Sequence, residues 1–254
     1  MFQSKQQELM FQPIADIIDS SFPEFTGRDL SKLPNCTVLN KEFDLLNVNQ
    51  KFLKFTPQDS DMPYPELSYE ERIYQQGLIA SRSHNWHDFF NALVWKKFPK
   101  TKAALNAIHY QELSKQKNSM RSRKRDLLTL FDECGVIVIA NDDILNLIRS
   151  HNWHELFVSN RKLWLQGEIQ TITFGHAMYE KYLNPYIGMT AQALLLDANI
   201  VDLDKYLARR LLKQTLLMTK AELSPLPLLG IPDWYNTQDA EFYANTNYFR
   251  PQKP

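Results

Sequence analysis

A histidine and a glutamate one helical turn apart are the first side chains here that could do acid–base chemistry. His176 and Glu180 are spaced i, i+4, so on a helix they share a face. An imidazole and a carboxylate in that relation can act as a general base with its orienting group, or as two ligands of one metal ion. Gly175 would let the chain approach a neighbour closely just before this helix. The alternative is an ordinary pair of polar side chains on a helix surface.

A second polar stripe begins at His87. His87, Asn91 and Trp95 are spaced i, i+4, i+8, beside the apolar stripe of the same predicted helix, and Asp88 follows His87. We expect His87 and His176 to lie at the rim of one core and to share a pocket, within about 12 Å of each other. The candidate catalytic residues are His87, Asp88, Asn91, His176 and Glu180, and the candidate metal ligands are His87, His176 and Glu180.

Further carboxylates and a thiol precede a predicted strand. Asp132 and Glu133 could add acidic groups to a site, or simply form a solvated helix end. Cys134 is interpreted as structural, because its neighbour Gly135 marks a turn, although a nucleophilic thiol paired with a histidine base is the alternative.

A hexapeptide occurs twice, letter for letter. The sequence RSHNWH fills residues 82–87 and again residues 149–154. In both copies an asparagine is followed three residues later by an acid, which is typical of a capping box at a helix start. We therefore expect each copy to begin a helix, with these pairs as caps: Asn85 with Asp88, and Asn152 with Glu155.

Segments around the first copy resemble a known family. The run NWHDFFNALVW at residues 85–95, followed by FPKTK at 98–102, is similar to the signature of a bacterial family named domain of unknown function 3025. The resemblance covers residues 50–251 and implies a single bacterial domain, with no established activity to carry over. The second hexapeptide resembles the family mainly at its tryptophan, so His154 is a weaker candidate than His87. Supporting segments are LTLFDE at 128–133, GHAMYEK at 175–181, PLPLLGIP at 225–232 and FRP at 249–251.

Composition excludes several classes of protein. Lys plus Arg and Asp plus Glu each number 29, so the chain of 254 residues has no net charge, which disfavours nucleic-acid or anionic membrane partners. The 7 glycines are too widely spaced for a P-loop, a dinucleotide fingerprint or a nucleophile elbow. Cys36 and Cys134 are too few for a disulfide framework or a zinc ribbon.

Two segments bear on location and partners. The N-terminus lacks a secretory signal, and no apolar run reaches the roughly 20 residues of a membrane span. We therefore expect a cytoplasmic protein. Residues 115–125 hold six basic residues and no acid, which predicts a solvated, mobile loop; a nucleic-acid patch is the disfavoured alternative, because no aromatic residue is interleaved.

Hydrophobic patterning predicts a helix-dominated α+β fold in one domain, residues 1–254. A helix and turn-rich lead-in occupies residues 1–49, the family-like core residues 50–251, and an extended tail rich in proline and aromatic residues wraps the core near the C-terminus. Thr101 and Asp142 are predicted helix caps. Helices are predicted at 1–20, 68–76, 85–98, 126–133, 143–149, 152–166, 175–184 and 203–219, and strands at 51–55, 136–140 and 168–174.

Two classes of function fit these residues. The first is a small-molecule or metal-binding enzyme with a His/Asp/Glu polar pocket, whose cofactor is unknown and could include one divalent metal ion. The alternative is a non-catalytic binding or assembly protein, whose tryptophans pack a core and present a groove to a small molecule or a protein.

Overall fold

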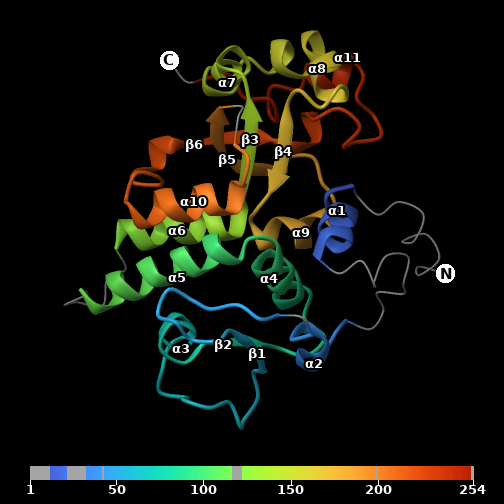
Figure 1. Cartoon of the computed structure of the whole chain (residues 1–254). Coiled ribbons are helices and arrows are strands. Elements are labelled where there is room, and N and C mark those ends of the chain that lie inside the picture. The colour runs from blue at the N-terminus through green and yellow to red at the C-terminus, as the bar shows by residue number, and fades with distance from the viewer. Residues whose placement is uncertain (1–11, 22–32, 42, 116–121, 198–199, 253–254) are drawn as a thin grey trace, which may run out of the picture. The chain divides into compact units, whose positions relative to one another are not determined.

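The computed structural model describes residues 12–21, 33–41, 43–115, 122–197 and 200–252 (Figure 1). The described chain is mixed, 49% helical and 15% strand, which confirms the helix-dominated α+β class. No described helix is both long enough and apolar enough to cross a lipid bilayer.

The backbone contacts group the chain into two compact units. The first unit comprises residues 1–15, 130–200 and 220–254, and the second unit comprises residues 16–129 and 201–219. The expectation of one domain over residues 1–254 stays a prediction.

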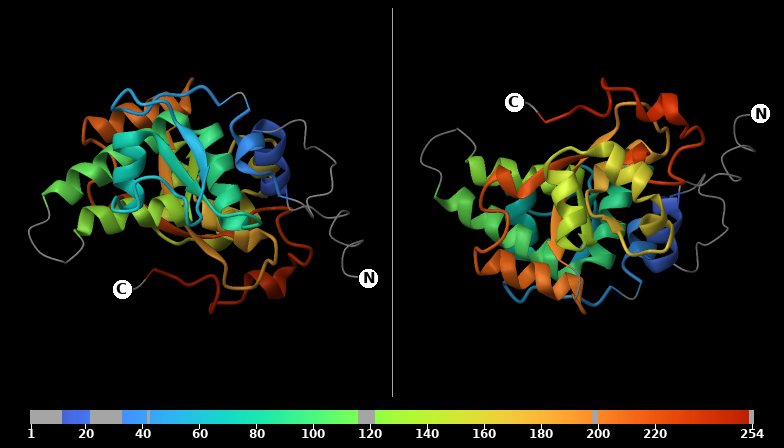
Figure 2. Two further views of the ribbon diagram at one scale, coloured as in Figure 1. Left: turned by 90° about the horizontal axis from the view of Figure 1, so that it is seen from below. Right: turned by 90° about the horizontal axis from the view of Figure 1, so that it is seen from above.

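Helices dominate the second unit, around a small parallel sheet of two strands. Its strands β1 and β2 are joined through helix α3, and α10 packs along α5 (Figures 1 and 2). Its elements are α2 (Cys36–Leu39), β1 (Lys54–Pro57), α3 (Tyr69–Gln76), β2 (Leu78–Ser81), α4 (Trp86–Lys97), α5 (Pro99–Ser114) and α10 (Leu203–Leu212).

Helix α3 has the boundaries that the sequence predicts. Ser68 and Glu71 form a capping box at its start, and Gly77 ends it with a left-handed φ of 75°. A Cβ atom at Gly77 would lie 2.1 Å from the carbonyl oxygen of Phe52, so glycine is required here. The strand predicted at 51–55 is displaced to Lys54–Pro57, because Phe52 forms an isolated bridge with Leu46 instead.

The cap of helix α5 differs from the prediction. Thr101 was expected as the N-cap, but the helix begins at Pro99. The backbone N–H groups of Lys100 and Thr101, which have no partner within the helix, donate instead to the carboxylate of Asp204, at 3.0 and 2.7 Å. Proline suits the first helical position because it needs no hydrogen bond there. A side chain from α10 thus replaces a local cap.

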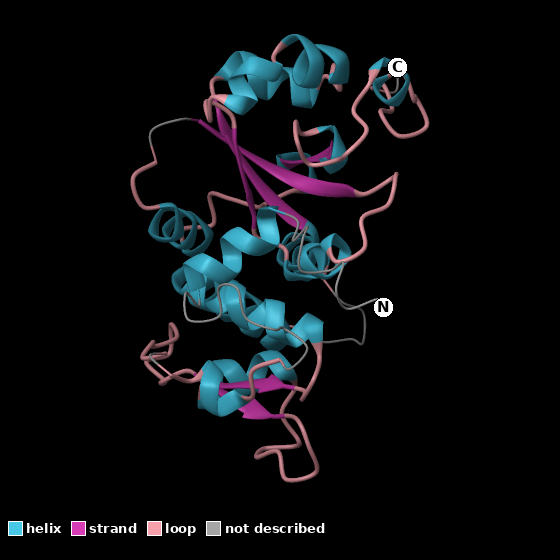
Figure 3. Cartoon of the chain, turned by 90° about the vertical axis from the view of Figure 1, so that its right-hand side faces the viewer, coloured by secondary structure: helices cyan, strands magenta, loops and turns pink. Residues whose placement is uncertain are grey.

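The first unit is built on a mixed sheet of four strands, in the order β4-β3-β5-β6 (Figure 3). Strands β3 and β5 run parallel, and the two outer strands are antiparallel to them. Its strands are β3 (Gly135–Ala140), β4 (Gln170–Thr173), β5 (Thr190–Asp197) and β6 (Leu223–Pro227), and its helices are α7 (Asp142–Arg149), α8 (Arg161–Leu165), α9 (His176–Tyr182) and α11 (Ala240–Tyr243).

The C-terminal tail packs on this sheet. Its first part is strand β6, which places Pro225 and Pro227 on an edge strand, where a missing N–H group is tolerated. Farther on, the buried Tyr248 hydroxyl donates to the carbonyl of Met189 at 2.8 Å and accepts from the N–H of Leu229. The tail therefore covers apolar surface, as its aromatic content predicts.

Several predicted boundaries are corrected. Asn141, not Asp142, caps α7 by accepting from the N–H of Ile144. The helix predicted over 203–219 ends at Leu212, and strand β5 was not predicted. Residues 1–11 of the first predicted helix lie outside the described residues, and α1 covers Gln12–Ser21.

The predicted basic loop at 115–125 is shorter than expected where the structure describes it. Lys115 follows the last residue of α5, and residues 123–125 already belong to α6 (Arg123–Cys134). The ammonium of Lys124 donates to the carbonyl of Leu217. Residues 116–121 lie outside the described part, so the mobility of this segment stays a prediction.

Candidate functional site

The two copies of the hexapeptide adopt the same backbone turn. His84 and His151 both take a left-handed conformation, with φ of 54° and 53°, which histidine adopts more readily than most residues. The elements that precede the turn differ. The first copy follows strand β2, whereas the second ends helix α7: the N–H of His151 bonds to the carbonyl of Ile148, and that of Asn152 to Leu147.

After the turn, the first copy starts a regular helix. The side chain of Asn85 accepts from the N–H of Asp88 at 2.9 Å, which confirms Asn85 as the cap of α4, but the reciprocal bond of the predicted capping box is replaced by bonds from Arg82 to the Asp88 carboxylate. The carboxylate of Asp88 binds the backbone N–H and the guanidinium of Arg82, at 2.6 to 2.9 Å. Burial alone would raise the pKa of Asp88, but the hydrogen bonds from Arg82 outweigh it and lower that pKa below the usual range. Asp88 is therefore ionised and fixes the turn before the half-buried His87.

The second copy also begins a helical segment, since Trp153 and His154 are helical and the N–H of Leu156 donates to the carbonyl of Asn152 at 3.0 Å, but this segment is not the regular helix predicted over 152–166. A π-helical turn at Glu155–Ser159 precedes α8, and the described residues show no hydrogen bond from this turn to the side chain of Asn152. The indole Nε1 of Trp164 donates to the carbonyl of Leu156 at 2.9 Å. In an α-helix that carbonyl would accept from Asn160, whose N–H bonds to Glu155 instead. The predicted pairing of Asn152 with Glu155 as a cap is therefore not seen in the described structure.

Asn91 belongs to a polar cluster on α3, α4 and α5. Its carbonyl accepts from the ammonium of Lys102 at 2.9 Å, and its amide donates to the hydroxyl of Tyr69. Lys102 is only 5% exposed and lies 5.4 Å from the centre of the Trp95 ring, a favourable cation–π distance. Sequence reasoning missed Lys102, although it closes the FPKTK segment.

His176 lies at the start of α9, where the chain passes very close to the junction of α6 and β3. The N–H of Gly175 donates to the carbonyl of Gly135 at 2.7 Å. A Cβ atom on Gly175 would lie 2.5 Å from the carbonyl oxygen of Glu133. The close approach predicted for Gly175 is confirmed, and it brings His176 beside the last turn of α6.

A carboxylate from α6 faces this histidine. The Nδ1 atom of His176 lies 3.7 Å from Oδ2 of Asp132, and the two side chains are 8% and 23% exposed. On the same two helices, the Lys181 ammonium lies 3.9 Å from the Cys134 sulfur. Burial raises the pKa of the Cys134 thiol, and Lys181 offsets this only in part, so Cys134 is poorly suited to act as a thiolate nucleophile. Glu180 is exposed.

The five predicted site residues fall in different units. His87, Asp88 and Asn91 belong to the second unit, and His176 and Glu180 to the first, so their shared pocket stays a prediction. Among the described residues, no three histidine, cysteine, aspartate or glutamate side chains gather as metal ligands would.

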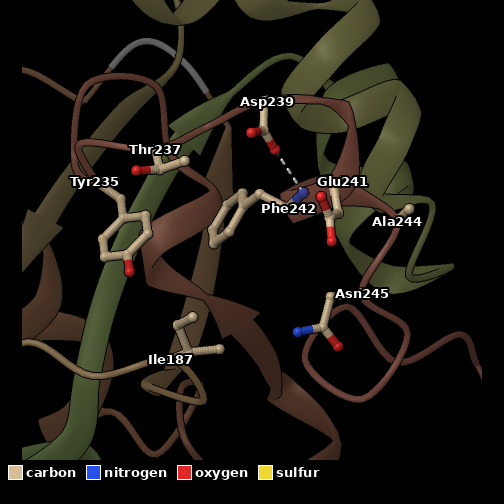
Figure 4. Close-up of a pocket in the computed structure, with 8 residues that line it drawn as sticks. All are labelled: Ile187, Tyr235, Thr237, Asp239, Glu241, Phe242, Ala244 and Asn245. Carbon is tan, nitrogen blue, oxygen red and sulfur yellow. Dashed lines mark hydrogen bonds between the residues drawn. The ribbon is translucent and has the colours of Figure 1, made fainter.

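A surface hollow of about 590 Å³ lies in the first unit beside α11 (Figure 4). None of the five predicted site residues lines it. The sequence did not predict this hollow, because its lining combines the C-terminal tail with a loop before β5 that is remote from the tail in the chain. The lining residues are Ile187, Tyr235, Thr237, Asp239, Glu241, Phe242, Ala244 and Asn245.

Comparison with known proteins identifies the family. No curated protein and no solved structure matches the chain. A family model described as "Protein of unknown function (DUF3025)" matches residues 53–253, close to the range over which the sequence resembles that family. The chain therefore belongs to the DUF3025 family of proteins of unknown function.

Proposed function

We propose that this protein is a small-molecule enzyme in which His176 transfers a proton and Asp132 orients its imidazole. The observation that carries the proposal is the distance of 3.7 Å between Nδ1 of His176 and Oδ2 of Asp132, at a largely buried position. A carboxylate beside Nδ1 favours the tautomer with a proton on that nitrogen, which leaves Nε2 as a base. Such contacts are often long before substrate binds.

The surroundings of the pair support a defined geometry. Gly175 fixes the backbone before His176 by its short hydrogen bond to Gly135, and Asp132 lies in a regular helix. A rigid base and a rigid orienting group are what proton transfer requires. Glu180 remains a proposed second carboxylate near the surface, and the metal-binding alternative has no support from the described side chains.

The proposed setting is a bacterial cytoplasm. Both cysteines, Cys36 and Cys134, are free thiols, as is usual in a reducing compartment.

Chromogenic ester, phosphoester, amide and glycoside substrates test the proposal. We expect His176→Asn to reduce turnover of the accepted class by about 100-fold or more, and Asp132→Asn to reduce kcat and alter its pH profile. His84→Asn is the control, because His84 is an exposed histidine outside the candidate site residues, and asparagine also tolerates its left-handed backbone. Melting curves of all three variants identify any loss that is due to unfolding.

Two results would contradict the proposal. One is full turnover by His176→Asn. The other is a chain that converts none of these substrates and is destabilised equally by His176→Asn and Asp132→Asn, which would make the pair structural. A non-catalytic binding protein is the second candidate function, and the hollow beside α11 favours it because its lining is separate from the predicted catalytic residues.

A further inference from the structure

We propose that the hollow beside α11 is a binding site for a small organic cation, an ammonium group carried on a compact apolar body. This α11 hollow is defined by the eight lining residues given above. The proposal does not depend on His176 or on the enzymatic function proposed for it.

The negative charge of the lining favours a cationic ligand. The lining includes two carboxylates, Asp239 and Glu241, and no lysine, arginine or histidine. One oxygen of Asp239 accepts from the N–H of Phe242 at 2.8 Å and thereby caps α11, so this carboxylate has a fixed position. Glu241 is exposed and projects beside the hollow (Figure 4). An anion would be repelled by both groups, whereas a cation would be attracted.

An aromatic wall provides the second attraction. The rings of Tyr235 and Phe242 are stacked, with centroids 5.2 Å apart and planes inclined by 23°. Phe242 is 8% exposed, and Phe249 packs edge-on against it with a centroid distance of 5.2 Å. Phe242 is thus covered by other rings and supports Tyr235, and the half-buried Tyr235 ring is the aromatic face that the hollow offers to an alkylammonium group.

The remaining lining suits the body of such a ligand. Ile187 offers an exposed apolar side chain, and Asn245 lies across the hollow from Tyr235 (Figure 4). The Oδ1 atom of Asn245 accepts from the N–H of Asn247 at 3.1 Å, which orients the amide. The volume of about 590 Å³ is within the range of small-molecule sites.

The probe is choline, and its matched control is 3,3-dimethylbutan-1-ol, which has nearly the same shape without the charge. Full-length protein is titrated with each compound while the aromatic side-chain resonances are followed by NMR. We expect choline to shift the signals of Tyr235 and Phe242 in a saturable way, and the neutral alcohol to bind about tenfold more weakly.

Variants of the lining test the two attractions separately. Glu241→Gln keeps the shape and removes one charge, so choline binding should weaken several-fold while binding of the alcohol is unchanged. Tyr235→Leu should weaken choline binding about tenfold, and Tyr235→Trp should preserve or strengthen it. Glu168→Gln, at an exposed glutamate of the same unit that does not line the hollow, is the control and should bind as the parent does.

The proposal is overturned if choline and the neutral alcohol bind equally, or if neither compound shifts these resonances. It is also overturned if Glu241→Gln and Tyr235→Leu leave choline binding unchanged. If Tyr235→Leu does not fold, Tyr235→Trp together with Glu241→Gln decides the question.

Discussion

Asn85 and Asn152 occupy equivalent positions after a left-handed histidine, but their side chains differ in hydrogen bonding. Asn85 accepts a hydrogen bond at the start of α4, whereas the described structure shows no such bond to Asn152. The helices that follow also differ: α4 is regular, whereas the segment after Asn152 passes into a π-helical turn at Glu155–Ser159, where the Trp164 indole donates to the carbonyl of Leu156. One residue type in one local conformation is thus a cap in one place and not in the other.

The two asparagines give a matched pair of substitutions. We predict that Asn85→Ala lowers the free energy of unfolding by about 1 kcal/mol, because a helix donor loses its partner. Asn152→Ala should cost less than about 0.5 kcal/mol. Urea denaturation measures both, and Asn85→Ser should recover most of the loss. Equal losses in the two alanine variants would show that Asn152 is also a cap.

At the scale of elements, one helix start is capped by a residue that is remote in the chain. The start of α5 receives the carboxylate of Asp204 from α10, about a hundred residues later in the chain. The hydroxyl of Thr101 also donates to the same carboxylate at 2.7 Å. These hydrogen bonds from α5 to Asp204 connect the two packed helices α5 and α10.

Hydrogen exchange tests the long-range cap. We predict that Asp204→Ala speeds amide exchange at Lys100 and Thr101 and destabilises the protein by about 1 to 2 kcal/mol, because two helix donors lose their acceptor. Asp202→Ala is the control: Asp202 caps α10 through the N–H of Lys205, so the Lys205 amide should respond instead. If Lys100 and Thr101 exchange at parental rates in Asp204→Ala, the cap does not stabilise α5.

At the scale of the whole molecule, each of the two units is built from segments that are not contiguous in the sequence. The segment 201–219 carries α10 back to the second unit, where Leu207 and Leu211 are buried. The second unit is therefore incomplete in any fragment that stops at residue 129.

Two fragments test this. We predict that residues 16–129 alone give a broad or absent unfolding transition, because α5 loses its packing partner and its cap. The same residues joined by a flexible linker to 201–219 should unfold cooperatively. Circular dichroism melts compare the two, and identical transitions would show that α10 is dispensable for the second unit.

Structure that depends on residues close together in the chain could be predicted from the sequence. The capping box and terminal glycine of α3, the Asn85 cap and the β-branched strand β3 all follow from side chains near their own backbone. The family was also evident from the sequence, because its motifs are contiguous.

Features that depend on residues remote in the chain became visible only in the folded structure. Strand β5 (Thr190–Asp197) was missed because its alanine, glutamine and leucine residues favour a helix locally, and only its pairing with β3 and β6 makes it a strand. The Asp132–His176 contact and the α11 hollow likewise unite segments more than forty residues apart. Hydrogen bonds and packing of this kind are chosen by the folded geometry, and no spacing in the sequence encodes them.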